Sequence, residues 1–168
     1  MPTLLVMRHG KSDWSAGHGS DHDRPLTSRG VRSARLMGRL LTGLDLAPDL
    51  VVSSTALRAL TTAHLAREAG RWDVAVDLAR DFYGGSPGDV LNLAAETPQT
   101  VERLMLVGHQ PTWSGLVGSL TGEWVDMKTG SVAVIEIPGP WSGLSGAAGE
   151  LIALHHPRQY FDSGWDTG

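Results

Sequence analysis

The first residues that suggest chemistry are an arginine and a histidine that directly follow a run of apolar residues. The stretch LLVMRHGKSDW, residues 4–14, places Arg8 and His9 after four apolar side chains. A short continuous apolar run is typical of a strand buried on both faces. Neighbouring side chains repel each other when both are cationic. We therefore expect that an anion lies between Arg8 and His9, or that the histidine is neutral.

Two further strand candidates lead to residues of the same kind. The strand expected at residues 49–53 runs into a helix whose first turn carries Arg58, and the strand expected at 103–107 is followed by Gly108 and His109. The carboxyl ends of parallel strands meet at one edge of a sheet, where ligands bind in such folds. The sequence therefore predicts one pocket formed by Arg8, His9, Arg58 and His109.

This combination of side chains suits a phosphoryl group. The forked guanidinium group matches phosphate oxygens, and each charge-assisted hydrogen bond contributes about 1.5–3 kcal/mol. A neutral imidazole nitrogen aimed at phosphorus is a competent nucleophile, and a backbone carbonyl can fix its tautomer. The residues alone thus predict a site that binds a phosphoryl group without a metal ion.

The elements that must position these residues alternate between strand and helix patterns. Strands are expected at residues 3–7, 49–53, 73–78, 103–107, 130–138 and 150–157, and helices at 26–44, 56–70, 86–97 and 112–122. This alternation predicts an α/β fold, a three-layer α/β/α sandwich on a mostly parallel central sheet. We expect Ser86 to cap the third helix with Pro87 at its first position, and Ser54 or Thr55 to cap the second.

Composition limits the function classes. The 168 residues predict one domain over residues 1–157, followed by a polar, loose tail over 158–168. The net charge of −4 argues against a nucleic-acid surface, and no apolar run approaches the ~20 residues of a membrane span. Cysteine is absent, which excludes disulfides, thiol catalysis and thiolate metal ligands. Without a basic-then-apolar leader pattern, a cytoplasmic protein is expected; no oligomeric state is predicted.

Four blocks resemble the histidine phosphatase superfamily, the phosphoglycerate-mutase-like proteins. They are RHG at residues 8–10, DRPLTSRG at 23–30, SSTALRALTTA at 53–63 and LVGHQP at 106–111. One RHG alone is a weak signal, but four blocks in the right order are specific. The RPLTxxG form, the stretch FYGGSPGDVL and the short length resemble the SixA-type phosphohistidine phosphatases. Only 27 residues separate Asp81 from His109, which leaves no room for the insertion of the mutases.

The resemblance implies a role for each matching residue. His9 would be the nucleophile that is transiently phosphorylated, Arg8 and Arg58 would bind phosphoryl oxygens, and His109 would be a second, cationic imidazole. No cofactor and no metal is implied. Arg24 sits where SixA-like proteins have an arginine at the mouth of the pocket. It either contacts substrate or pairs with an aspartate of its own loop, Asp21 or Asp23.

The sequence offers one candidate for the general acid, and this candidate has two interpretations. Larger relatives use a carboxylate after the third strand to protonate the leaving oxygen, and Asp81 lies in about that place. It is either this acid or an exposed turn carboxylate. A phosphorylated imidazole leaves as a neutral group when its ring is already protonated, so a phosphohistidine substrate needs less help from an acid than an ester does. Because Asp81 is either the general acid or a turn carboxylate, a phosphohistidine substrate, which needs less help from an acid, is favoured over an ester.

The loop after the first strand has two interpretations. It is either a solvated rim of the pocket or a binding site for a divalent cation such as zinc, with ligands from His18, Asp21, His22 and Asp23. Trp14 on this loop and Trp113 after the GHQP stretch either form walls of the pocket or pack in the core.

The sequence thus predicts a metal-independent phosphatase that works through a phosphohistidine intermediate, as a SixA-like protein phosphohistidine phosphatase. Its partner would be a phosphorylated protein or a small phosphorylated substrate. The alternatives are a broad small-molecule phosphomonoesterase on the same scaffold, a phosphate- or phosphoprotein-binding module without turnover, and a metal-dependent hydrolase.

Overall fold

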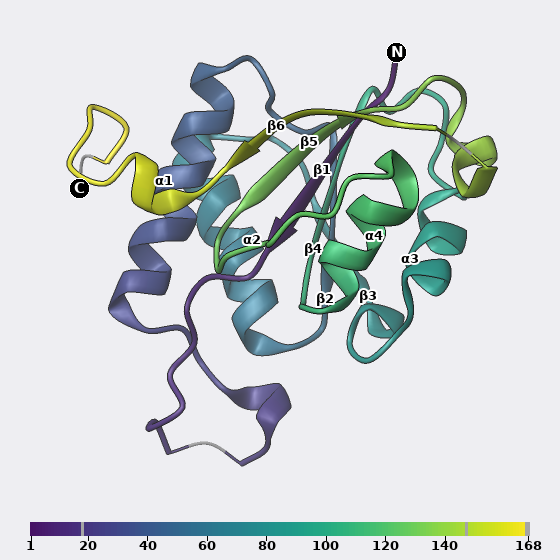
Figure 1. The fold of residues 1–168 in the computed structure, drawn as a ribbon. Helices are drawn as coiled ribbons and strands as arrows, with labels where there is room; N and C mark the ends of the chain where they lie inside the picture. The colour runs from purple at the N-terminus through teal and green to yellow at the C-terminus, as the bar shows by residue number, and fades with distance from the viewer. Residues whose placement is uncertain (18, 147, 167–168) are drawn as a thin grey trace.

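The computed structural model describes residues 1–17, 19–146 and 148–166 (Figure 1). Its strands are β1 (Thr3–Arg8), β2 (Leu50–Ser54), β3 (Val76–Ala79), β4 (Arg103–Gly108), β5 (Val132–Glu136) and β6 (Glu150–His155). Its α-helices are α1 (Ser28–Gly43), α2 (Leu57–Gly70), α3 (Pro87–Ala94) and α4 (Thr112–Thr121). Short 3₁₀ turns lie at Asp21–Asp23, Arg80–Phe82, Trp141–Gly146 and Pro157–Gln159.

All six strands form one mixed sheet in the order β3-β2-β4-β1-β5-β6. β1 pairs in parallel with β4, which pairs in parallel with β2, so the strands that carry the predicted site residues are neighbours. Arg8 at the end of β1 lies opposite Gly108 at the end of β4. β5 runs antiparallel to both β1 and β6. The predicted α/β sandwich on a mostly parallel sheet, of the phosphoglycerate-mutase-like type, is confirmed.

Helices cover both faces of the sheet, with α1 and α2 on one face and α3 and α4 on the other (Figure 1). β1 divides its side chains between two cores. Leu4 and Val6 pack toward α3 and α4, while Leu5 and Met7 pack toward α1 and α2. All four are fully buried, which explains why the strand is a continuous apolar run rather than an alternating one. Among the described residues, no helix is long and apolar enough to cross a membrane.

Helix starts follow the sequence signals in one case and depart from them in another. Ser86 caps α3, with Pro87 in the first turn. The Ser86 hydroxyl accepts from the Asp89 N–H and the Asp89 carboxylate accepts from the Ser86 N–H, which together form a capping box. The predicted cap of α2 is wrong, because its N-cap residue is Ala56 and not Ser54 or Thr55. Ser54 still belongs to β2, and its hydroxyl accepts a hydrogen bond from the Ala56 N–H at 3.2 Å.

The C-terminal segment, which the sequence analysis expects to be loose, contacts α1. Arg32 of α1 forms ion pairs with Asp162 and Asp166, and the Asp166 side chain is only 4% exposed. Arg39 of α1 donates a hydrogen bond to the Trp165 carbonyl at 2.7 Å. Composition alone suggests a free polar tail, but these acidic residues are complementary to the arginines of α1.

Candidate active site

A cavity of about 430 Å³ opens at the carboxyl edge of β1, β2 and β4. Its lining residues are Arg8, His9, Lys11, Ser12, Trp14, Arg24, Arg58, His109, Gln110 and Thr129. The structure therefore brings together six of the residues that the sequence singled out, namely Arg8, His9, Trp14, Arg24, Arg58 and His109. They come from the end of β1, the loop that follows it, the first turn of α2 and the residue after β4. Each is placed by the end of a rigid element or by a loop that packs against one.

Two glycines explain how the loop after β1 is held against α1. A Cβ on Gly10 would lie 2.7 Å from the Gly30 carbonyl oxygen, and a Cβ on Gly30 would lie 2.2 Å from the Lys11 carbonyl oxygen. Both distances are too short for any side chain. The Gly10 N–H donates to the Thr62 hydroxyl at 3.0 Å, and Thr62 donates to the Arg58 carbonyl at 2.7 Å. The chain beside His9 is thus fixed by both α1 and α2.

His9 is buried and held in one orientation. Its Nδ1 lies 2.6 Å from the Gly10 carbonyl oxygen, and because a carbonyl only accepts, Nδ1 carries the proton. Burial lowers the pKa of His9 to about 3; the Gly10 carbonyl opposes this, and the nearby His109, Arg8 and Arg58 add to the lowering. The imidazole is therefore neutral at pH 7, with an unprotonated Nε2. This is the form that can attack phosphorus.

His109 lies beside His9, with ring centroids 5.2 Å apart. Its Nε2 is hydrogen-bonded to the Ser54 hydroxyl at 2.7 Å, and its buried Nδ1 has no partner within the described residues. Burial and the charge of Arg58 are the main causes that lower its pKa to about 4. Sequence analysis expects a cationic imidazole here, whereas this environment makes His109 neutral at pH 7.

The arginines retain donors for an anion. Arg8 donates from Nη1 to the Met127 carbonyl at 3.0 Å, and burial lowers its pKa. In the described part of the chain, the Nε–H groups of Arg8 and Arg58 are buried without a partner. Buried donors that lack a partner are rare and costly. An anion in the cavity would accept from such donors.

Asp21 is a residue of the site that sequence reasoning weighed only as a metal ligand or an ion-pair partner. Its backbone carbonyl and its Oδ2 accept from Arg58 at 2.7 and 3.1 Å, while its Oδ1 accepts from Arg24 at 3.0 and 3.2 Å. Its Oδ2 also accepts from the Tyr83 hydroxyl at 2.9 Å. Although desolvation opposes this, the hydrogen bonds from Tyr83 and Arg24 and the arginine charges lower the pKa of Asp21 to about 2. The carboxylate is therefore ionised and holds both guanidinium groups in place.

Arg24 has the ion pair that one interpretation of the sequence expected, whereas its contact with substrate stays a prediction. It pairs with Asp21, and it also lines the cavity with its side chain buried. Its Nη1 donates to the Ser12 hydroxyl, and its guanidinium lies 3.5 Å from the centre of the Trp14 ring. Trp14 therefore forms a wall of the cavity, as one interpretation held. Trp113 does not, because this residue of α4 is fully buried in the core.

Asp81 is not brought together with the other predicted residues. It is exposed on the 3₁₀ turn after β3 and is absent from the described residues that line the cavity. Tyr83, two residues further on, reaches the site instead. Its ring centre lies 5.6 Å from that of His109 and 5.9 Å from the Arg58 guanidinium. The stretch FYGG is part of the resemblance, but no spacing rule indicates which of its residues faces the pocket.

The metal interpretation of the loop finds no geometric support where the chain is described. Over residues 1–17, 19–146 and 148–166, no group of three or more histidine and carboxylate side chains is placed to hold a metal ion. Asp21 is used by the arginines, and Nε2 of His22 is hydrogen-bonded to the Thr55 hydroxyl at 2.9 Å. His18, the remaining predicted ligand, lies outside the described residues.

This fold and site are those of a phosphatase with a histidine at the centre of its pocket. Residues 4–102 match the model of the histidine phosphatase superfamily (branch 1). The chain belongs to this superfamily, and the resemblance seen in the sequence is confirmed.

Similar proteins extend the likeness over most of the chain. An uncharacterised protein of Mycobacterium tuberculosis is 36% identical over 164 residues, which cover 90% of this chain and all of that protein. A Nakamurella multipartitia structure assigned as a SixA phosphohistidine phosphatase is 31% identical, with a TM-score of 0.83 over 93% of this chain and 96% of that one. A structure of the protein histidine phosphatase SixA with tungstate is 27% identical, with a TM-score of 0.81 over 94% and 98% of the two chains. The chain is therefore SixA-like within the superfamily.

Proposed function

We propose that this phosphatase removes the phosphoryl group from phosphohistidine side chains of proteins, without a metal ion, through an intermediate on His9. The observation that carries the proposal is the state of His9. Its proton is held on Nδ1 by the Gly10 carbonyl, its pKa is lowered to about 3, and it shares a cavity with Arg8, Arg58 and His109. A neutral imidazole surrounded by phosphate-binding donors is poised for nucleophilic attack.

In the first step, Nε2 of His9 attacks phosphorus while Arg8 and Arg58 bind the phosphoryl oxygens. A bond forms between His9 Nε2 and phosphorus, and the bond from phosphorus to the substrate nitrogen breaks. The electron pair of the broken bond returns to the substrate imidazole, which leaves as a neutral ring if its other nitrogen carries a proton. The Gly10 carbonyl stabilises the positive charge that His9 gains, because it accepts a hydrogen bond from the Nδ1–H group.

In the second step, water attacks the phosphorylated His9. A bond forms between the water oxygen and phosphorus, the bond from phosphorus to Nε2 breaks, and its electron pair restores neutral His9. The proton lost by the water passes to the phosphate product. The negative charge of a bound phosphoryl group would raise the pKa of His109, and a protonated His109 would then donate to a phosphoryl oxygen.

The lack of a carboxylate among the described residues that line the cavity supports phosphohistidine over an ester as the substrate. An alkyl ester needs an acid to protonate its leaving oxygen. No carboxylate lines the cavity among the described residues, and Asp81 is exposed away from it. Asp21 is near, but with a pKa of about 2 it has no proton to give at pH 7. The likeness to SixA proteins, one of them in complex with the oxyanion tungstate, supports the same substrate class.

The test is hydrolysis of a phosphohistidine peptide and of para-nitrophenyl phosphate, measured side by side in the presence of a chelator. His9→Ala should abolish turnover of both substrates, while His64→Ala, an exposed histidine of α2, should have no effect. The wild type should prefer the phosphohistidine peptide. Loss of activity with the chelator would contradict the metal-independent mechanism, and activity retained in His9→Ala would contradict the nucleophile.

The other functions considered from the sequence correspond to other outcomes. Efficient turnover of the ester with little on the peptide would make the protein a small-molecule phosphomonoesterase. Phosphate binding without turnover of either substrate would make it a binding module. The cytoplasmic location expected from the sequence stays a prediction.

A further inference from the structure

Basic side chains are concentrated around the catalytic cavity and two further cavities. Ten of the fourteen lysine and arginine side chains line these three cavities. Asp166 is the one acidic residue among their described lining residues, although the chain has eighteen aspartates and glutamates and a net charge of −4. The charge of the protein is therefore strongly asymmetric, with a basic surface on an acidic molecule.

The second cavity, of about 120 Å³, is continuous with the catalytic one. Lys11 and Thr129 line both cavities. The other basic residues around it are Arg29 at the start of α1, Lys128 before β5 and Arg158 after β6. All of these lysines and arginines are exposed. An anionic group bound here would lie directly beside a phosphoryl group in the active site.

Most of the positive charge at this second cavity is not neutralised by the protein itself. Lys128 pairs with Asp126, but Lys11, Arg29 and Arg158 have no ion pair with any residue that the structure describes. His156, which also lines the cavity, has its pKa lowered first by burial and then by the charges of Arg158 and Lys128. The local electrostatic potential is therefore positive and available to a partner.

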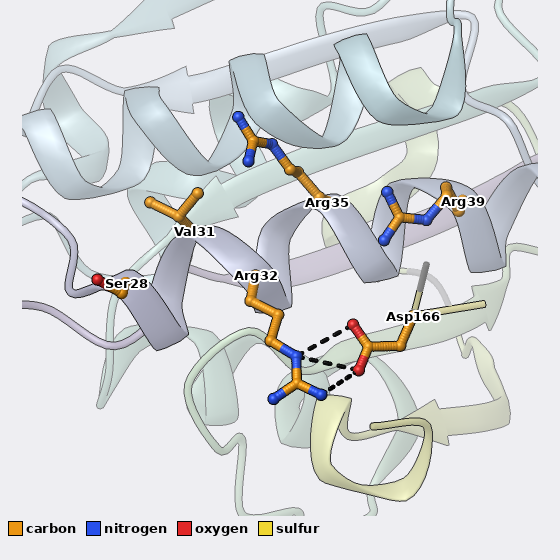
Figure 2. Close-up of a pocket in the computed structure, with 6 residues that line it drawn as sticks. All are labelled: Ser28, Val31, Arg32, Arg35, Arg39 and Asp166. Atoms are coloured by element: carbon orange, nitrogen blue, oxygen red, sulfur yellow. Dashed lines mark hydrogen bonds and ion pairs between the residues drawn. The ribbon is translucent and has the colours of Figure 1, made fainter. Parts of the chain in front are cut away.

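The third cavity continues the basic surface along α1. Figure 2 shows Arg32, Arg35 and Arg39 on neighbouring turns of this helix, with Arg32 bonded to Asp166. Arg35 is exposed and has no ion pair within the described residues. Arg39 lies ten residue positions after Arg29 in the helix, a rise of about 15 Å. The basic surface thus extends well beyond one phosphate group.

We infer that this basic surface, which runs from Lys11 through Arg29 and Arg158 to Arg35, is the docking site for an acidic protein that carries the phosphoryl group. The inference rests on the proposed function and names the kind of substrate protein: acidic side chains flank its phosphohistidine. Charge complementarity of this sort steers encounter and selects partners. A small-molecule substrate would have no use for positive charges so far from the phosphorus atom.

The aromatic ring of Phe161 at the second cavity is covered by arginines. The guanidinium groups of Arg29 and Arg32 lie 4.7 and 4.4 Å from its ring centre. Charge is therefore the means of recognition at this cavity, and the binding test below distinguishes an acidic protein from a nucleic acid.

The first test measures binding without turnover. Fluorescein-labelled peptides with a central unphosphorylated histidine, flanked either by glutamates or by glutamines, are titrated with the full-length protein at low salt. The glutamate peptide should bind at least about tenfold more tightly, and the difference should disappear at high salt. Arg29→Glu and Arg158→Glu should each weaken its binding about threefold or more, and together about tenfold or more.

Arg71→Glu is the matched control, since Arg71 is exposed at the end of α2 and lines none of the three cavities. Arg71→Glu changes the net charge by the same amount as each single variant, and it should leave peptide binding unchanged. Turnover of para-nitrophenyl phosphate should be equal in the wild type and all of these variants, which also shows that they are folded.

Three results would overturn the docking site. These are equal binding of the two peptides, unchanged binding in Arg29→Glu/Arg158→Glu, and tighter binding of a DNA duplex or of phosphatidylserine vesicles than of the glutamate peptide. Because the peptides are unphosphorylated, the binding measurements do not depend on hydrolysis of a phosphoryl group. Failure to hydrolyse a phosphohistidine peptide would contradict the proposed function alone. When the same peptides are phosphorylated, the glutamate form should have the higher kcat/KM in the wild type and lose this advantage in the double variant.

Discussion

The two buried histidines should make the protein sensitive to mild acid. The pKa of His9 is lowered to about 3 and that of His109 to about 4, whereas an exposed histidine in the unfolded chain titrates near 6.5. Between these values the unfolded state binds more protons than the folded state. Stability therefore falls as the pH is lowered through 6.5 and continues to fall until the folded pKa is reached.

The magnitude follows from the pKa differences. One pKa unit corresponds to about 1.36 kcal/mol. Between pH 7 and pH 5 the unfolded histidine becomes almost fully protonated, while His9 and His109 stay neutral in the folded protein. Each histidine should then reduce the free energy of unfolding by about 2 kcal/mol, and the pair by about 3–4 kcal/mol.

The assay is urea unfolding at pH 7 and pH 5 for the wild type, His9→Gln, His109→Gln and the double variant. Each single substitution should remove about half of the acid-dependent loss, and the double variant should remove most of it. Other titrating groups are common to all four proteins and cancel in the comparison. Inorganic phosphate should reduce the loss in the wild type, because a bound anion favours protonated imidazole. An equal loss of stability in the wild type and the double variant would refute this account of the site.

Three further substitutions test other parts of the structure. Gly30→Ala should destabilise the protein by about 1–3 kcal/mol in thermal unfolding, because its Cβ would lie 2.2 Å from the Lys11 carbonyl oxygen. Gly143→Ala is the control and should not destabilise the protein, since the space around Gly143 is open. Equal Tm values for the two variants would contradict the close packing at Gly30. Asp21→Asn should cost about 1 kcal/mol at pH 7 after solvent screening is allowed for, and it should strengthen inhibition by inorganic phosphate because Arg24 and Arg58 lose their counter-ion. The stability that Asp21 contributes should itself be lost as the pH falls from 3.8 toward 2, and a variant with unchanged urea unfolding and unchanged phosphate inhibition would contradict the ion pairs. Asp81→Asn should leave phosphohistidine turnover within about twofold in a steady-state assay, and a selective loss on esters would instead make Asp81 their general acid.

It was predictable that the site residues would lie close together, because they lie at the ends of strands or just after them. Arg8, His9 and His109 directly follow or end buried apolar runs, and parallel pairing brings such ends to one edge. Arg58 follows by the same logic, since it lies in the first turn of the helix after β2. In these cases a local pattern determines the position of a side chain in the fold.

The parts that escaped prediction depend on contacts between distant segments. Asp21 lies on an irregular loop, and nothing in its local sequence indicates that it bridges Arg24 to Arg58 of α2. The pKa values of the histidines depend on burial, which a strand pattern does not measure. Trp113 was placed either in the core or at the pocket, and only the tight fit of its ring against Gly108 decides for the core.

The bridge formed by Asp21 also has a consequence for product release. A phosphatase must release inorganic phosphate after every catalytic cycle. Arginines without an acidic partner would bind that dianion tightly and slow its release. Because the carboxylate of Asp21 already shares Arg24 and Arg58, part of their charge is neutralised before any phosphate arrives. The free energy gained when phosphate binds is correspondingly smaller, since the anion displaces or shares existing ion pairs instead of meeting bare cations. We therefore expect Asp21 to limit product inhibition while it keeps the guanidinium groups oriented for the next substrate.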